Sequence, residues 1–160
     1  MVHEAYLSLT GVNQGKFRGE SPRPNWSEKI QFISFNYEVK SPRDVATGQA
    51  SGKRQHSAIT VTKDWGAASP QLFQAAVNNE ILTEVLFEFL KINPEGEQYV
   101  YYTVKLTGGR ISDYKAYVGP VKHRESSDDY ELEDISFTFD RIELVNKDAK
   151  TAGSDSWTGR

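Results

Sequence analysis

"SAITVTKDWGAASPQLFQAAVNNE", residues 57–80, holds the one clear helix pattern in a sequence whose apolar residues otherwise alternate. Its first part, Ala58–Thr62, is rich in β-branched residues and is typical of a strand. Ser69 is a favourable N-cap, and Pro70 follows at the first helical position, where its missing N–H is harmless. We therefore expect one short amphipathic helix at about 69–80. Its predicted contacts with the core are Leu72, Phe73, Ala76 and Val77.

Strands explain most of the remaining pattern. Period-two alternation and turn signals predict strands at 28–39, 58–62, 83–92, 97–106, 110–118 and 132–145. The apolar phase slips by one residue near Asp140, which predicts a bulge or a sharp bend of the kind used where a sheet closes on itself. We expect a mainly β fold, an antiparallel β-barrel of two sheets with the short α-helix packed on its side and a long extended loop.

Two of the predicted strands are apolar on both faces. In the strand at 28–39, Phe32 lies in one phase and Phe35 and Tyr37 lie in the other. The strand at 97–106 is likewise rich in Tyr and Val in both phases. One small helix covers only one patch of a sheet, so we expect further copies of the chain to cover the rest.

The length of 160 residues fits a single domain, which we place at 1–145, followed by a mobile C-terminal tail at 146–160 that is polar except for Trp157. The sequence contains no cysteine, which excludes disulfides, thiolate nucleophiles and Cys-based zinc sites. Neither a secretory signal peptide nor an apolar stretch of about 18 residues is present. We expect a protein that is made in the cytosol and does not insert into membranes.

The charges are segregated along the chain. The formal net charge of −3 is too balanced for a general nucleic-acid binder. However, residues 40–54 are basic except for Asp44, whereas residues 125–134 are acidic. These segments attract each other, within one copy or between copies, or they are two separate loops that face water.

The motifs that resemble catalytic or cofactor sites are weak. "TGQASGKR", residues 47–54, lacks the glycine spacing of a phosphate loop and is interpreted as a flexible loop. Glu84 and Glu88 lie on one face of a strand at about 13 Å, which exceeds the separations of glycosidase pairs. The three histidines show no ligand spacing. We expect no catalytic, cofactor-binding or metal site.

Residues 58–80 resemble the haemolysin-coregulated protein (Hcp) family, the tube-forming subunits of bacterial type VI secretion. The shared elements are a strand that ends in Thr-Lys, a short corner, and Ser-Pro-x-Leu at the start of the helix. Three further stretches agree in order: "YYTVKLTGGRISDY" at 101–114, "EDISFTFDRIEL" at 133–144 and the ending "GSDSWTGR" at 153–160. The resemblance covers essentially the whole chain.

The resemblance implies a homo-hexameric ring, with rings stacked into a tube that is secreted from the bacterial cytoplasm without a signal peptide. Its implied partners are a VgrG-type spike protein, a contractile sheath and small effectors carried in the lumen. The loop at 40–57 corresponds to the extended loop of the family, which implies a reach to an adjacent ring or protomer. The expected ring or stacking contacts, chosen from the charge segregation, are Arg43, Asp44, Lys53, Arg54, Asp128 and Asp129.

An alternative stays open from the residues alone. A monomeric β-barrel that acts as a binding module, or as a carbohydrate-active enzyme using Glu84 and Glu88, also fits the alternation. Oligomeric mass distinguishes the two interpretations, because only the tube subunit requires a ring.

Overall fold

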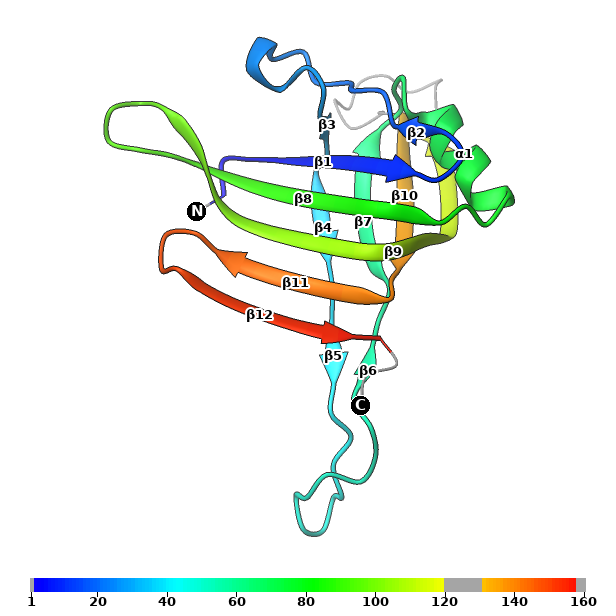
Figure 1. Ribbon diagram of the computed structural model, residues 1–160, viewed down its shortest axis with the longest axis vertical. Helices are drawn as coiled ribbons and strands as arrows, with labels where there is room; N and C mark the ends of the chain where they lie inside the picture. Colours follow the sequence, from blue (N-terminus) through cyan, green and yellow to red (C-terminus); the bar gives the residue numbers. More distant parts are fainter. Residues whose placement is uncertain (1, 120–130, 158–160) are drawn as a thin grey trace.

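A computed structural model describes residues 2–119 and 131–157. The fold is mainly β with one short α-helix (Figure 1). The helix is α1 (Ser69–Val77), and a 3-10 turn, η1, spans Pro24–Trp26. The strands are β1 (Glu4–Gly11), β2 (Gly15–Lys16), β3 (Ile30–Gln31), β4 (Ser34–Asn36), β5 (Val39–Lys40), β6 (Gln55–His56), β7 (Ile59–Asp64), β8 (Leu82–Ile92), β9 (Gln98–Val118), β10 (Glu131–Thr138), β11 (Arg141–Asn146) and β12 (Thr151–Ser156).

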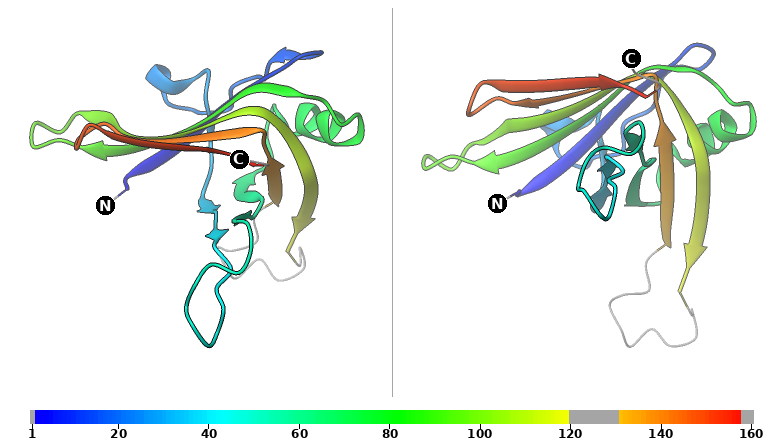
Figure 2. Two further views of the ribbon diagram at one scale, coloured as in Figure 1. Left: turned by 60° about the horizontal axis from the view of Figure 1, so that its bottom comes forward. Right: turned by 90° about the horizontal axis from the view of Figure 1, so that it is seen from below.

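Apart from the β5–β6 pair, the strands form two antiparallel sheets that share strand β9. Its first half pairs with β8 and β11, and its second half pairs with β10, so the sheet order runs β2-β1-β8-β9-β10-β7-β4. The sequence predicted a turn at 107–109 between two strands, but the chain bends there without reversing. Gly108 takes a φ of +64°, and a Cβ at this position would clash with the Asp140 carboxylate. A glycine bend therefore folds one strand across both sheets (Figure 2).

The predicted strand at 28–39 is three short strands with different partners. β3 pairs with β1, β4 pairs with β7, and β5 pairs with β6. Between β3 and β4, the N–H of Phe32 donates to the C=O of Ala5 at 3.2 Å, and the N–H of Ile33 donates to the C=O of Thr62 at 2.7 Å. The segment thus crosses from one sheet edge to the other, which explains why its alternation is apolar on both faces.

Aromatic side chains fill the space between the sheets. Phe32 meets Phe87 edge-on at 5.8 Å, and Phe35 meets Phe87 at 5.2 Å. Phe87 also contacts Phe137 on β10 at 5.8 Å. Edge-to-face packing of this kind is the favoured geometry for aromatic pairs. The crossing segment is therefore held by the core as well as by its backbone hydrogen bonds.

The helix starts at the predicted residue but buries a different stripe. Leu72 and Ala75 are fully buried, and Ala76 is partly buried against the core. Phe73 and Val77, which we predicted as core contacts, are 52% and 58% exposed. Only one stripe of α1 thus faces the sheet, as is usual for a helix on the surface of a domain. A core position for Phe73 predicts that Phe73→Asp unfolds the protomer, whereas its observed exposure predicts that this variant stays folded.

The helix also ends and caps differently from the prediction. It ends at Val77 rather than near residue 80, and Ala68, rather than Ser69, is the N-cap. The Ser69 hydroxyl instead donates to Glu133 at 2.7 Å and accepts from the N–H of Gly66 at 2.9 Å. The side chain that would cap the helix therefore ties it to the sheet.

A buried ion network lies beneath the start of the helix. The Lys63 ammonium contacts Glu133, approaches Glu20 Oε1 at 3.1 Å and donates to the Asp64 carbonyl at 2.7 Å. Lys63 and Glu133 are both fully buried. The Tyr114 hydroxyl donates to Glu133, and burial together with this hydrogen bond raises the pKa of Tyr114 above its usual range. Every charge in the network thus has a partner, which buried charges require.

The segment after residue 145 differs from the predicted mobile tail. Residues 151–156 form β12, which pairs along its whole length with β11. This segment, "TAGSDS", has no large apolar side chain, so its composition carries no strand signal. Backbone hydrogen bonds to β11, the polar contacts of Asp155 and the packing of Trp157 on Phe139 hold it in place.

Lys63 offers a test of the buried network. Lys63→Met leaves Glu133 buried without its counter-charge, so we expect the free energy of unfolding to fall by about 3–5 kcal/mol. Urea unfolding followed by circular dichroism measures the loss. Lys105→Met on the exposed side of β9 is the matched control and should change stability by less than about 0.5 kcal/mol. Equal unfolding midpoints for the two variants would contradict the role given to the network.

Candidate functional site

The loop at 40–57 projects from the body of the protomer as an extended hairpin (Figures 1 and 2). At its base, β5 pairs with β6, and further out Arg43 forms a β-bridge with Ala50. The tip turns at Asp44, whose N–H donates to the Gln49 carbonyl at 2.7 Å. Val45 in this turn is fully exposed. The loop that the sequence predicted without regular structure is thus a defined arm, and we call residues 40–57 the arm.

Arg54, His56 and Asp155 form a latch that fixes the base of the arm. The Arg54 guanidinium donates to both Asp155 oxygens, one of them at 2.8 Å, and His56 Nε2 lies 2.8 Å from Asp155 Oδ2. The Tyr37 hydroxyl lies 2.7 Å from His56 Nδ1. Hydrogen bonds from Arg54 hold the pKa of Asp155 well below its usual range. Because Asp155 is on β12, the latch joins the arm to the C-terminal strand.

Aromatic rings enclose the latch. The His56 ring stacks on Trp157 at 5.7 Å and meets Phe139 at 5.5 Å. Phe139 and Trp157 are in turn 4.9 Å apart, edge to face. The His56 side chain is 2% exposed, so its hydrogen bonds are shielded from competing water. His56 is therefore the buried member of the latch, whereas the Arg54 and Asp155 side chains are 33% and 32% exposed.

Arg43, Asp44 and Lys53 lie exposed on the arm. Asp44 has a local role as well, because its Oδ1 accepts from the N–H of Ala46 at 2.8 Å and shapes the turn. No ion pair of Arg43 or Lys53 occurs within the described residues. These positions are thus available to another molecule.

Arg54, which we predicted as a ring or stacking contact, points back into its own chain. Its guanidinium is committed to Asp155 in the latch, because that carboxylate offers two oxygens in the matching geometry. Asp128 and Asp129, the predicted acidic partners, lie outside the described residues. No local pattern identifies Asp155 as the partner of Arg54, because the two residues are 101 positions apart.

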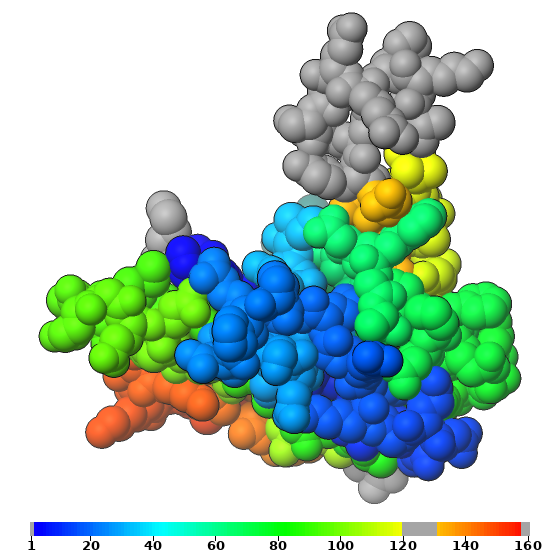
Figure 3. Space-filling view, turned by 90° about the horizontal axis from the view of Figure 1, so that it is seen from above, coloured from blue at the N-terminus to red at the C-terminus, as the bar shows by residue number. Residues whose placement is uncertain are grey.

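An aromatic groove lies at the end of the protomer beside the β8–β9 hairpin. The hairpin and the turn between β11 and β12 project together from the body (Figure 3). Near them, side chains of β8, β9 and β11, together with residues 35–37 and Val2, line a cavity of about 450 Å³. We call this cavity the aromatic groove; its main lining residues are Phe35, Tyr37, Phe89, Tyr101, Tyr102 and Leu144. Five of these side chains pack against the core and are only partly buried, so the groove is an open end of the core: Phe35, Tyr37, Phe89, Tyr102 and Leu144.

A second apolar surface lies on the helix. Phe73 and Val77 are one turn apart on α1, so they share a face, and the Phe73 ring contacts Tyr114 at 6.3 Å. We call Phe73, Val77 and Tyr114 the helix face. An exposed apolar patch on a folded domain is typical of a surface that contacts another molecule.

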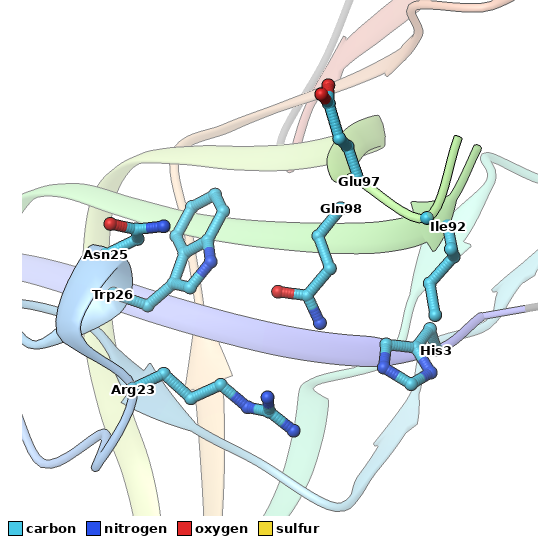
Figure 4. Close-up of a pocket in the computed structure, with 8 residues that line it drawn as sticks. His3, Arg23, Asn25, Trp26, Ile92, Glu97 and Gln98 are labelled. Carbon is cyan, nitrogen blue, oxygen red and sulfur yellow. The ribbon is translucent and has the colours of Figure 1, made fainter. Parts of the chain in front are cut away.

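A polar pocket of about 590 Å³ lies between η1, the start of β1 and the β8–β9 hairpin (Figure 4). Trp26 forms one wall and stacks on Tyr6 at 5.2 Å. Arg23 and His3 reach into the same space, but the Arg23 guanidinium is paired with Glu4 at 2.5 Å. The charge of Arg23 is thus already balanced by Glu4.

The carboxylates weighed as catalytic residues do not form a pair. Glu88 is buried and bonded to Lys29 at 2.7 Å, whereas Glu84 is exposed. Within residues 2–119 and 131–157, no group of three His, Asp or Glu side chains is placed to hold a metal ion. In the same ranges, none of the helices has the length and apolar character needed to cross a bilayer.

Comparison with known proteins relates the whole fold to one family. The family described as "Type VI secretion system effector, Hcp" matches residues 6–145. The major exported protein of Pseudomonas aeruginosa is 32% identical over 166 residues, which cover 98% of this chain and 96% of that protein.

Solved structures share the architecture. The secreted protein Hcp3 of Pseudomonas aeruginosa is 29% identical and superposes with a TM-score of 0.79, over 96% of this chain and 97% of that one. A crystal structure of an Hcp protein superposes with a TM-score of 0.89 at 23% identity, over 96% of this chain and 97% of that one. At 23% identity, the latter similarity concerns the fold alone.

Asp155→Asn tests the latch. The variant loses the charge that Arg54 and His56 share, so we expect faster amide hydrogen exchange in the arm and in β12, and a lower urea midpoint at pH 7. Because the pKa of Asp155 is lowered by folding, its contribution is present above the unfolded-state pKa of about 3.9 and is lost as the pH falls below it. The midpoint difference from the wild type should therefore shrink below about pH 4.

Asp148→Asn is the matched control for this experiment. Asp148 is exposed and accepts only from the Tyr99 hydroxyl at 3.2 Å among the described contacts. Its replacement should leave exchange in the arm unchanged. If both variants left the arm equally protected, the latch would not be what holds it.

Proposed function

The chain belongs to the Hcp family of type VI secretion systems, and on that premise we propose that six copies close into a ring whose stacking builds the tube. Members of the family are secreted structural proteins that form hexameric tubes. The chain is accordingly a tube protein and not an enzyme, which sets aside the carbohydrate-active alternative.

The latched arm is the observation that carries this proposal. Its residues from Ser41 to Ala50 are exposed except for the partly buried Pro42, so the arm contributes little to the core of its own copy. Yet its base is fixed by two charge-assisted interactions and a shell of aromatic rings. A long segment that is held rigidly away from its own domain is suited to reach another molecule. In a stack of rings, that molecule is a neighbouring copy.

The arm offers positive charge to this neighbour. Arg43 and Lys53 are exposed on it, and the partners that complement them are acidic side chains of the adjacent copy. Asp128 and Asp129, in the acidic segment at 125–134, are the candidates that the sequence provides. Asp44, next to Arg43, shapes the tip and contributes to the same contact.

The assembled tube defines the further partners. A VgrG-type spike protein caps the stack, a contractile sheath surrounds it, and small effectors travel in the lumen. These partners follow from membership in the family, because a ring of copies of this chain is the tube around which the secretion system is organised.

The native mass tests the ring. Light scattering behind a sizing column should give a species of six times the 18.1 kDa of one chain. The measurement uses the complete chain at several concentrations, since dissociation by dilution follows mass action. A monomer at every concentration would overturn the proposal.

Charge reversal tests the arm contact. Arg43→Glu together with Lys53→Glu should reduce the stacked or ring-sized fraction at low salt, because it places like charges opposite each other. The wild type should also assemble less at high salt, since exposed charges are screened there. Lys105→Glu, with the same charge change on the body of the protomer, is the control. Unchanged assembly of the double variant at low salt would remove Arg43 and Lys53 from the contact.

A further inference from the structure

We propose that the helix face of each copy docks into the aromatic groove of the next copy around the ring. The inference rests on the proposed hexamer and goes beyond it by assigning the two surfaces that meet. The occupant of the groove is thus a second copy of this chain, and its contact residues are Phe73 and Val77.

The two surfaces lie at opposite ends of the protomer. The helix precedes β8 and packs on the second half of β9, near Tyr114. The groove lies by the end of β8 and the start of β9, near Phe89 and Tyr101. Figures 1 and 2 show α1 and the β8–β9 hairpin at the two ends of the same long sheet. A copy placed beside another therefore brings one surface toward the other.

Ring symmetry requires two unlike surfaces. In a closed ring of identical chains, each copy uses one patch toward the copy ahead and a different patch toward the copy behind. The helix face is convex, with two side chains that stand out from a helix, whereas the groove is a cavity of about 450 Å³. The helix face and the aromatic groove are thus two unlike surfaces on one chain, as the head-to-tail contact of a ring requires.

The composition of both surfaces is that of an interface core. Charged residues make up 26% of the chain, yet α1 contains none, and none lines the groove. The groove is rich in Phe and Tyr, the residues enriched at the centre of protein interfaces. Neither surface would therefore bury an unpaired charge when the two meet.

Polar amides frame both surfaces. Gln74 and Asn78 are exposed beside Phe73 and Val77, and Asn36 is exposed at the groove. Amide groups of this kind donate and accept hydrogen bonds at the rim of an interface. The rim thus complements the apolar centre.

The arm fits the groove less well than the helix does. Val45 is fully exposed at its tip, but Arg43 and Asp44 flank it closely. Insertion of the tip would carry these charges toward the groove, where Lys91 lies 4.1 Å over the Tyr101 ring and would repel Arg43. The helix face brings no such cost.

Disulfide trapping tests the docking. Because the sequence contains no cysteine, only the introduced thiols can form disulfides. Val77→Cys and Leu144→Cys in one chain place one thiol on the helix face and one in the groove. On oxidation we expect most of the chain to run as a ladder of cross-linked multimers on a non-reducing denaturing gel. On the same gel, each single variant should run as a single chain, and a mixture of the two single variants should give cross-linked dimers only. Phe73→Cys with Tyr102→Cys is a second pair, in case the first disturbs packing.

Val77→Cys with Glu143→Cys is the matched control, since Glu143 neighbours Leu144 on β11 but points to the other face of the sheet. Light scattering in reducing buffer is run on each double variant and on the wild type. Ring-sized mass without a ladder for either test pair would overturn the docking while leaving the hexamer intact. A ladder of equal strength from the control pair would also overturn it. A wild type that is monomeric would overturn the hexamer and the docking together.

Discussion

The bend of β9 at Gly108 is the constraint on which the rest of the fold depends. One strand supplies ladder hydrogen bonds to β8 and β11 on one side of the bend and to β10 on the other. The left-handed φ at Gly108 and its close approach to Asp140 leave no room for a side chain. Because both sheets share this strand, their facing sides enclose one aromatic core, and the short segment at 30–36 links their other edges.

Local patterns were sufficient for the class of the fold and for its single helix. The β-branched run before α1, and Ser69-Pro70 at its start, identified that unit because each signal acts within a few residues. Local patterns did not predict which residues of α1 are buried. Whether Phe73 faces the core or solvent depends on how much sheet lies beneath the helix, which is a property of the whole fold.

The interactions that could not be predicted from the sequence are those between polar residues far apart in the chain. Nothing near Arg54 distinguishes it from Arg43, yet one is held by Asp155 and the other is exposed. Lys63 and Glu133 are likewise separated by 70 residues and meet only because β7 pairs with β10. In β12, backbone pairing with β11 and the contacts of Asp155 give order to a segment without large apolar side chains, and its composition carries no signal of this.

The latch also has a consequence for the order of events during synthesis. Asp155 leaves the ribosome about a hundred residues after Arg54, so the base of the arm stays unfixed while most of the chain is being made. Long-range closure of this kind is slow to form, because the entropy of a large loop must be overcome first. A nascent chain therefore lacks the latch until β12 has been made, and before that point the β5–β6 pairing is what joins the two sides of the arm at its base.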